Sequence, residues 1–274
     1  MIRPVKTYDE CRTFATSFQG DPSFSAPMLS SEEQVQCNLV RPIGNPDRYC
    51  VFGVYCEETL TGLFAFLVIR DEQYAEMLVG LSREKAAYSE ALQYLEQHFP
   101  GYGVDFVFNP GNCLLREQLN TRKADFEPEQ QKMVLEAPAP DMDTTGIVPL
   151  SDQYAEQYCA IHNKNMYWTG EKVMQAQDRF HTFLAIRDGR VVGYIDVTCT
   201  FKENEPFDLL VLEEYRRMGY GRKLLAKALE VNAPNAMSVL VDADNVPAIR
   251  LYASMGFAKK QTILTAHWTV PSSE

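Results

Sequence analysis

The stretch from 207 to 225 restricts the fold more than any other part of the chain. It begins with the apolar run Phe207-Asp-Leu-Leu-Val and continues into a turn that contains Gly219 and Gly221. Leucines at helical spacing start directly after this turn, at Leu224. This order predicts a strand, a tight turn and the N-terminus of a helix.

The turn has the chemistry of an anion site. Glycines two residues apart let the backbone pass close to a ligand, and the first amides of the following helix point toward it. The basic residues of the turn are Arg216, Arg217, Arg222 and Lys223, in a chain whose formal net charge is -11. The alternative is a tight turn with solvated basic residues, which a lone glycine pair would favour. Leu224 replaces the third glycine of a dinucleotide fingerprint, and no Gly-x-x-x-x-Gly-Lys-Ser/Thr loop is present.

A second pattern follows downstream. Residues 237 to 241 are apolar and predict a buried strand, and Asn245 then caps a helix with Pro247 in its first turn. Gly256 and Phe257 close that helix.

Together the two patterns resemble the GNAT superfamily of acyl-CoA N-acyltransferases. The family's Arg/Gln-x-x-Gly-x-Gly/Ala occurs here as Arg216-Arg-Met-Gly-Tyr-Gly221, with Glu213 where proline is common. The family's Asn-x-x-Ala-x-x-x-Tyr-x-x-x-Gly-Phe is matched at every fixed position from Asn245 to Phe257. The resemblance covers about the last half of the chain and implies acetyl-CoA as co-substrate and no metal.

The resemblance also assigns residues to roles. The expected cofactor-binding residues are Leu210, Val211, Leu212, Arg216, Arg217, Met218, Gly219, Tyr220, Gly221, Arg222, Asn245, Ala248 and Tyr252. The backbone amide of Val211 or Leu212 is expected to hold the thioester carbonyl, and Tyr252 is expected to act as general acid. A phenol with an ordinary pKa of ~10 stays protonated at neutral pH and can protonate a leaving thiolate. The alternative for Tyr252 is an aromatic side chain of the core.

The general base has several candidates. Glu205 lies where some relatives keep a catalytic glutamate, whereas Asp208 is nearer the strand centre and Asp196 lies on the preceding strand. A water relay is a fourth alternative. No nucleophile or metal-ligand spacing surrounds the histidines at 162, 181 and 267, so core or surface roles are expected for them. Tyr167 and Trp168 are expected to cover the acceptor site or to form a hydrophobic lid.

The first half of the chain carries a degenerate copy of the same order. Residues 81 to 112 match residues 212 to 245 element for element, but the first copy has Ser82-Arg-Glu-Lys instead of a glycine turn. An acid such as Glu84 in the first turn of a helix repels a diphosphate. We expect an α/β (α+β) chain of two tandem GNAT-like domains, each a mixed, mostly antiparallel sheet flanked by helices. The predicted division is 1–137 without the cofactor loop, a linker at 138–145, and an acetyltransferase domain at 146–274.

Composition restricts the partners and the compartment. The sequence pI of about 4.9 argues against nucleic-acid binding and against binding to anionic membranes. The seven cysteines are widely spaced and no signal peptide is present, so a cytoplasmic protein with reduced thiols is expected. The apolar run from 63 to 69 is too short to span a bilayer.

The expected activity is direct transfer of an acetyl group from acetyl-CoA to a primary amine. Two alternatives stay open, namely a non-catalytic acyl-CoA-binding or regulatory module and an acyltransferase that uses a longer acyl-CoA. The expected partner is a small-molecule or peptide amine whose identity the sequence leaves open, and a homodimer is compatible with the sequence.

Overall fold

The chain consists of two compact units in a computed structural model that describes residues 1–24, 29, 31–138, 142–164 and 167–272. The first unit contains residues 1–130 and 261–274, and the second contains residues 131–260. None of the described helices is long and apolar enough to cross a membrane.

The first unit is a mostly antiparallel sheet with helices on both faces. Its strands, in spatial order, are β1 (Ile2–Pro4), β2 (Tyr49–Cys56), β3 (Thr59–Ile69), β4 (Tyr74–Ser82), β5 (Gly103–Phe108) and β14 (Phe257–Thr269), and the short β6 (Asp125–Phe126) also pairs with β14. Its helices are α1 (Tyr8–Thr16), α2 (Glu32–Val35), α3 (Arg41–Ile43), α4 (Lys85–His98) and α5 (Cys113–Thr121). The β4–β5 pair is parallel, as expected for strands joined through a helix.

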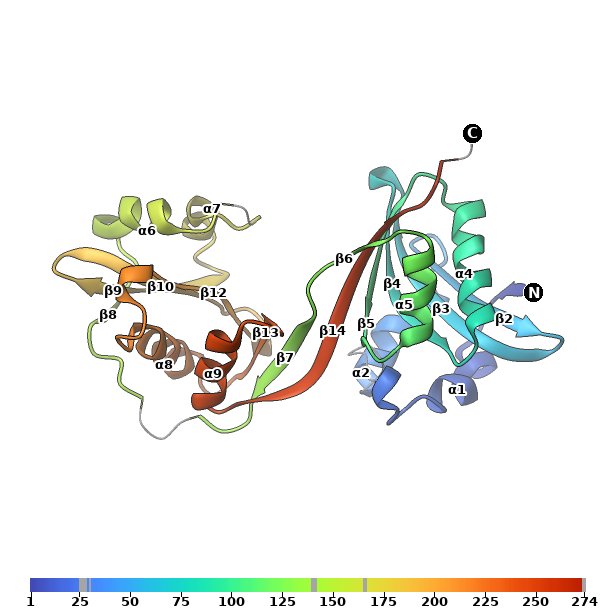
Figure 1. Cartoon of the computed structure of the whole chain (residues 1–274), viewed down its shortest axis with the longest axis horizontal. Helices are drawn as coiled ribbons and strands as arrows, with labels where there is room; N and C mark the ends of the chain where they lie inside the picture. The colour runs from blue at the N-terminus through green and yellow to red at the C-terminus, as the bar shows by residue number, and fades with distance from the viewer. Residues whose placement is uncertain (25–28, 30, 139–141, 165–166, 273–274) are drawn as a thin grey trace. The chain divides into compact units, whose positions relative to one another are not determined.

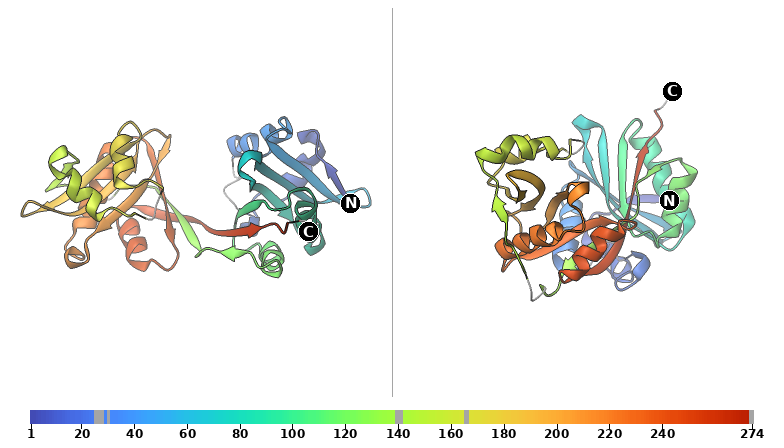
Figure 2. Two further views of the ribbon diagram at one scale, coloured as in Figure 1. Left: turned by 90° about the horizontal axis from the view of Figure 1, so that it is seen from above. Right: turned by 60° about the vertical axis from the view of Figure 1, so that its left-hand side comes forward.

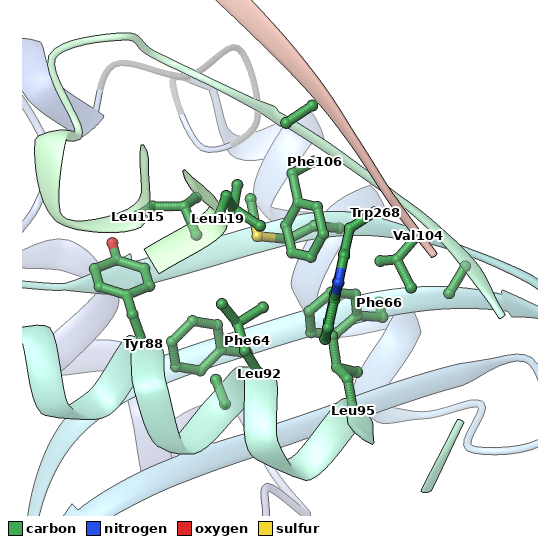
Figure 3. Packing of buried hydrophobic residues seen from close by; sticks show 14 of the residues in the cluster. Phe64, Phe66, Tyr88, Leu92, Leu95, Val104, Phe106, Leu115, Leu119 and Trp268 are labelled. Carbon is green, nitrogen blue, oxygen red and sulfur yellow. The ribbon is translucent and has the colours of Figure 1, made fainter. Parts of the chain in front are cut away.

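Alternation along the strands divides the core of this unit between the two faces of its sheet. Phe64 and Phe66 of β3 pack with the α4 and α5 side chains, whereas Leu63 belongs to the cluster of α1. Figure 3 shows the first cluster, in which Tyr88 of α4 and Trp268 of β14 lie among the labelled residues.

The second unit has two sheets. One contains β12 (Pro206–Val211), β10 (Arg190–Thr198), β9 (Phe180–Arg187) and β8 (Ile147–Pro149). The other contains the start of β14, whose Phe257 packs in the core of this unit, then β7 (Gln130–Leu135), β13 (Ala236–Asp242) and β11 (Glu203–Asn204). Its helices are α6 (Ala155–Ile161), α7 (Gly170–Gln175), α8 (Tyr220–Asn232) and α9 (Val246–Ser254). In Figures 1 and 2, α6 and α7 lie over one face of the first of these sheets and α8 lies under the other.

The predicted hairpin of this unit is confirmed. Strands β9 and β10 are antiparallel, and the turn between them has left-handed backbone at both Asp188 (φ 51°) and Gly189 (φ 75°). Two consecutive residues with positive φ form the hairpin turn that matches the twist of the strands.

The boundaries of the units differ from the expected ones because each half gives its last strand to the other unit. The strand that the sequence places in the first domain, β7, contributes Met133 to the core of the second unit. The final strand, expected in the second domain, pairs with β5 from Leu264 to Thr269 and supplies Trp268 to the first unit. Positions 139–141 of the expected linker lie outside the described residues.

Candidate acyl-transfer site

The site begins where the strand of residues 203–211 changes its partner. Glu203 and Asn204 pair in parallel with β13, but from Pro206 onward the chain pairs with β10 instead. The end of β12 therefore lies in a different sheet from β13. The Leu212 N–H donates to Val192 O (2.9 Å), so by the alternation of an antiparallel ladder the Val211 N–H points to the open edge of β12. Of the two amides expected to hold the carbonyl, Val211 is the one directed to that edge.

The predicted glycine turn and helix follow β12. Arg217 (φ 62°) and Gly219 (φ 89°) both have left-handed backbone, and α8 begins at Tyr220 without a side-chain cap. Among the described residues no acceptor is found for the backbone N–H groups of Tyr220, Gly221 and Arg222. These amides and the positive end of the helix dipole suit a diphosphate.

Gly221 marks the point where three elements meet. A Cβ added there would lie 3.4 Å from Leu251 of α9, 3.9 Å from Val211 and 4.0 Å from Leu209, all ordinary van der Waals contacts. Gly221 also has no positive φ. Neither packing nor backbone conformation within the described chain thus requires a glycine, which is consistent with close approach of a ligand.

The basic residues of the turn divide into structural and unpaired cations. Arg216 Nε donates to Val211 O (3.1 Å) and Arg222 donates to Ser254 Oγ (2.9 Å), so both join the turn to neighbouring elements. Lys223 pairs with Asp143 at 2.8 Å. For the exposed Arg217 no hydrogen bond or ion pair is found in the described part of the chain, so its guanidinium is available to an anion.

Helix α9 places the expected general acid. Asn245 caps it by accepting a hydrogen bond from the Ala248 N–H (3.2 Å), which confirms the predicted cap. Tyr252 is 7% exposed; burial and, next, the Asp208 charge raise the pKa of its phenol to about 12. Every fully buried side-chain N or O atom of the described residues has a hydrogen-bond partner. No partner is found among these residues for the Tyr252 hydroxyl, so its oxygen is not fully buried and is accessible from outside.

The two leading candidates for the base lie in different surroundings. Glu205 lies between β11 and β12, where its backbone bonds to Thr198, and burial raises the pKa of its carboxyl. Asp208 is three residues farther along, about 10 Å at the rise of a strand. Burial raises its pKa too, although the Tyr194 hydroxyl, at 2.6 Å, and the charge of His162 oppose the rise. Asp208, unlike Glu205, is near enough to affect Tyr252.

A buried charge cluster surrounds Asp208. His162 Nε2 lies 2.9 Å from Asp196 Oδ2 and 3.8 Å from Asp208 Oδ2, and the His162 and Asp196 side chains are 1% and 0% exposed. The buried position of His162 agrees with the core role expected for it, but its two carboxylate partners were not anticipated. They are distant in sequence, and only the register that places Asp196 opposite Asp208 on β10 and β12 brings them together.

The hydrogen bonds of this cluster fit an ion pair better than a metal site. Ligand atoms of His162, Asp196 and Asp208 lie within 4.8 Å of one another, close enough to hold an ion. The Asp196 oxygens, however, already accept hydrogen bonds from Tyr158, from Thr182 (2.6 Å) and from the imidazole itself. Coordination would have to displace these donors.

The remaining candidates lie at the rim. The Trp168 ring packs edge-on against Phe180 at 5.1 Å. Tyr167 is 75% exposed, and its ring contacts Trp168 edge-on at 5.4 Å and lies 3.9 Å from Lys172 Nζ. His181 is exposed on β9. His267 belongs to the first unit, where it contacts Asp105 (2.6 Å) and Glu127 (2.9 Å).

Comparisons with known proteins agree with this geometry. Residues 147–257 match the Acetyltransferase (GNAT) family. An N-alpha-acetyltransferase from Sulfurisphaera tokodaii is 32% identical over 97 residues, an alignment that covers 30% of the chain and 58% of that relative, so the chain spans little more than half of its length.

Two solved structures share the fold over almost the whole chain. A GCN5-related N-acetyltransferase from Sphaerobacter thermophilus has a TM-score of 0.65 at 16% identity and covers 100% of this chain and 97% of its own. A GNAT-family acetyltransferase from Colwellia psychrerythraea has a TM-score of 0.53 at 12% identity, with 98% and 100% covered. At these identities the likeness concerns the fold alone.

Proposed function

Because the chain carries a GNAT-family acetyltransferase domain in residues 147–257, we propose that it transfers an acetyl group from acetyl-CoA directly to a primary amine. The observation that carries the proposal is that three groups lie on adjoining elements of the second unit. They are the first-turn amides of α8, for which no acceptor is found among the described residues, the outward-facing Val211 N–H and the accessible Tyr252 hydroxyl.

Each group has a function in acyl transfer from a thioester. The α8 amides, with Arg217 beside them, bind the diphosphate of acetyl-CoA. The Val211 N–H stabilises the oxyanion that forms when the amine attacks the thioester carbonyl. The Tyr252 phenol, whose pKa of about 12 keeps it protonated at neutral pH, supplies the proton that the leaving thiolate needs.

The acceptor amine is the remaining part of the proposal. The relative from Sulfurisphaera tokodaii is named an N-alpha-acetyltransferase, which favours a peptide N-terminus among the amines. A test panel should therefore contain peptides with free N-termini, peptides whose lysine is the free amine, and small polyamines.

The test is release of CoA from acetyl-CoA in the presence of each amine, compared with Tyr252→Phe. We expect the variant to lower kcat by about 10²-fold, the scale of general acid catalysis, while the affinity for acetyl-CoA changes little. Binding of acetyl-CoA without release of CoA for any amine would favour the non-catalytic binding module. Turnover only with a longer acyl-CoA would change the donor but preserve the site.

A further inference from the structure

We propose that Asp208 takes the proton from the acceptor amine and that His162, locked by Asp196, is the positioning residue that holds Asp208 ready. This inference rests on the proposed acetyl transfer and adds to it the base and the charge of the acceptor. It is carried by a cluster that connects α6, β9, β10 and β12 of the second unit.

The geometry makes His162 a cation. Its Nδ1 lies 3.1 Å from the Asn163 carbonyl oxygen and its Nε2 lies 2.9 Å from Asp196 Oδ2. A carbonyl oxygen and a carboxylate oxygen are both acceptors, so each ring nitrogen must carry a hydrogen. Burial by itself lowers the pKa of His162, but these two contacts and the charges of Asp196 and Asp208 outweigh it and raise the pKa.

Asp196 is the fixed part of the cluster. It has no exposed surface, and its two oxygens accept from the Tyr158 hydroxyl (2.9 Å to each), the Thr182 hydroxyl (2.6 Å) and His162. These three donors fix the position of the carboxylate. Its charge neutralises His162, and the imidazole ring is further held by stacking on Tyr194 at a ring separation of 4.8 Å.

Asp208 is the member of the cluster that reaches outward. Its side chain is 16% exposed, and the Tyr194 hydroxyl donates to its Oδ2 at 2.6 Å. With His162 positive and both carboxylates negative, the cluster has a net charge of about -1. The excess charge thus lies on Asp208, near Tyr252, and attracts an acceptor that arrives as an ammonium ion.

The proton balance of the reaction requires such a group. The ammonium loses its first proton to the Asp208 carboxylate, and the neutral amine attacks the thioester carbon, where a C–N bond forms. The C–S bond then breaks as the thiolate takes the Tyr252 proton. The nitrogen gives up its second proton to the Tyr252 phenolate, which restores the phenol. Asp208 releases its proton to solvent, so the reaction yields an amide, CoA thiol and one proton.

The same cluster explains why Asp208 suits this task better than Glu205. Glu205 has Lys132 and Glu203 as its charged neighbours, and no histidine partner is found for it in the described part of the chain. The polar groups that face His162 are Tyr158 of α6, Glu171 of α7, Tyr194 and Asp196 of β10, and Asp208 of β12, while Thr182 of β9 bonds to Asp196. A built network therefore surrounds one candidate base and not the other.

The first experiment compares carboxylate variants in the full-length protein with acetyl-CoA and the best amine of the panel. We expect Asp208→Asn to lower kcat by about 10²-fold or more, the scale of general base catalysis, with CoA affinity retained. Glu205→Gln is the competing arm, and Glu156→Gln, an exposed carboxylate of α6, is the matched control. Loss of turnover in Glu205→Gln with normal turnover in Asp208→Asn would overturn the assignment.

The second experiment separates positioning from stability by a pH profile. His162→Gln removes the cation 3.8 Å from Asp208, so the pKa of Asp208 should rise further. Because the base acts only when ionised, we expect the acid limb of kcat/KM to move to higher pH by about one unit. A merely structural histidine would lower the melting temperature and leave that limb in place, which would contradict the proposal.

The third experiment needs no core variant and remains decisive if His162→Gln does not fold. Nitrogen-15 NMR of the wild-type protein should show both His162 ring nitrogens protonated at pH 7, with assignment by substitution of His98, His181 and His267. A neutral tautomer would overturn the proposed cluster. If the NMR result agrees but no amine is acetylated by the wild-type protein, the proposed function fails and not the cluster geometry.

Discussion

The two units contain the same strand-turn-helix element, but the turn is shorter and lacks glycine in the first. There, Arg83 and Glu84 alone separate β4 from α4, and two donors of the turn are satisfied internally. The Ser82 N–H donates to the Tyr88 hydroxyl (3.2 Å) and the Glu84 N–H donates to Ser82 Oγ (2.9 Å). In the second unit the link from Leu212 to Gly219 is longer, and the amides that follow it have no acceptor among the described residues.

In both units, the strand that precedes the turn separates from its parallel neighbour. β4 and β5 pair in parallel only as far as Met77 and Phe106. Beyond that point lies a small pocket that is open to solvent and is lined in part by Phe24, Leu81 and Phe108. The first unit thus has the diverging strands of the second unit without its glycine turn.

The second helices of the two units differ at the position of the acid. Asn112 and Asn245 cap α5 and α9 with almost identical backbone, φ -76° in both, and each accepts from the amide three residues on. Counting from these caps, Leu119 takes the place of Tyr252. Leu119 is fully buried in the first core. The unit without the glycine turn therefore also has no phenol at this position, and we expect one active centre per chain.

Among the tests of this difference between the two units, we expect the largest effect from Gly221→Glu, which should abolish CoA binding. A carboxylate at the mouth of the α8 amides would take the place of the diphosphate and repel it, so we expect affinity to fall at least about 100-fold. Calorimetry of the unsubstituted protein should give one CoA-binding site per chain. The matched control is Ala86→Glu at the corresponding position of α4, which should change nothing.

Either of two results would contradict the proposed difference in CoA binding between the two units. Unchanged affinity in Gly221→Glu would mean that the turn does not bind the cofactor. Loss of affinity in Ala86→Glu, or two sites per chain, would mean that the first unit binds it as well.

The elements that the sequence predicted well are those whose information is local. The glycine turn, the Asn245 cap and the Asp188-Gly189 hairpin each depend on backbone preferences of a few adjacent residues. The exchange of last strands could not be predicted in this way. The apolar alternation that includes Leu264 and Trp268 predicts a buried strand but not the sheet that receives it, because pairing partners are set by tertiary packing.

The same limit explains which part of the site was missed. The acid and the cofactor turn form continuous motifs, whereas the His162 cluster is assembled from α6, β10 and β12. Its members are 34 and 46 residues from His162 in the chain, the separations to Asp196 and Asp208. A histidine without local partners is more often structural, and only the register of β10 and β12 reveals the carboxylates beside it.

The next effect concerns Gly256, the second residue after the end of α9. Gly256 has φ 98°, and a Cβ there would lie 1.7 Å from Ala137 O, so the backbone itself would have to move. This move would also strain the hydrogen bond from the Glu136 N–H to Gly256 O. We expect Gly256→Ala to destabilise the second unit by about 3–5 kcal/mol. Urea unfolding can be followed through Trp168 in a Trp268→Phe background, and a loss under about 1 kcal/mol would contradict the clash.

The smallest effect is expected at the corresponding position of the first unit, Lys123, which follows α5. Lys123 has φ 58° although it carries a Cβ, and its side chain is exposed with no partner found in the described part of the chain. Glycine removes the left-handed strain but loses more entropy on folding, so Lys123→Gly should stabilise the first unit by about 0.5–1 kcal/mol. Lys123→Ala, which deletes the same charge but keeps the Cβ, should show no such gain. Trp268, buried in the first core, reports this unit alone in a Trp168→Phe background. Equal stability of the two variants would mean that the left-handed residue carries no strain, and the two helix ends would then differ only in the Ala137 carbonyl that faces Gly256.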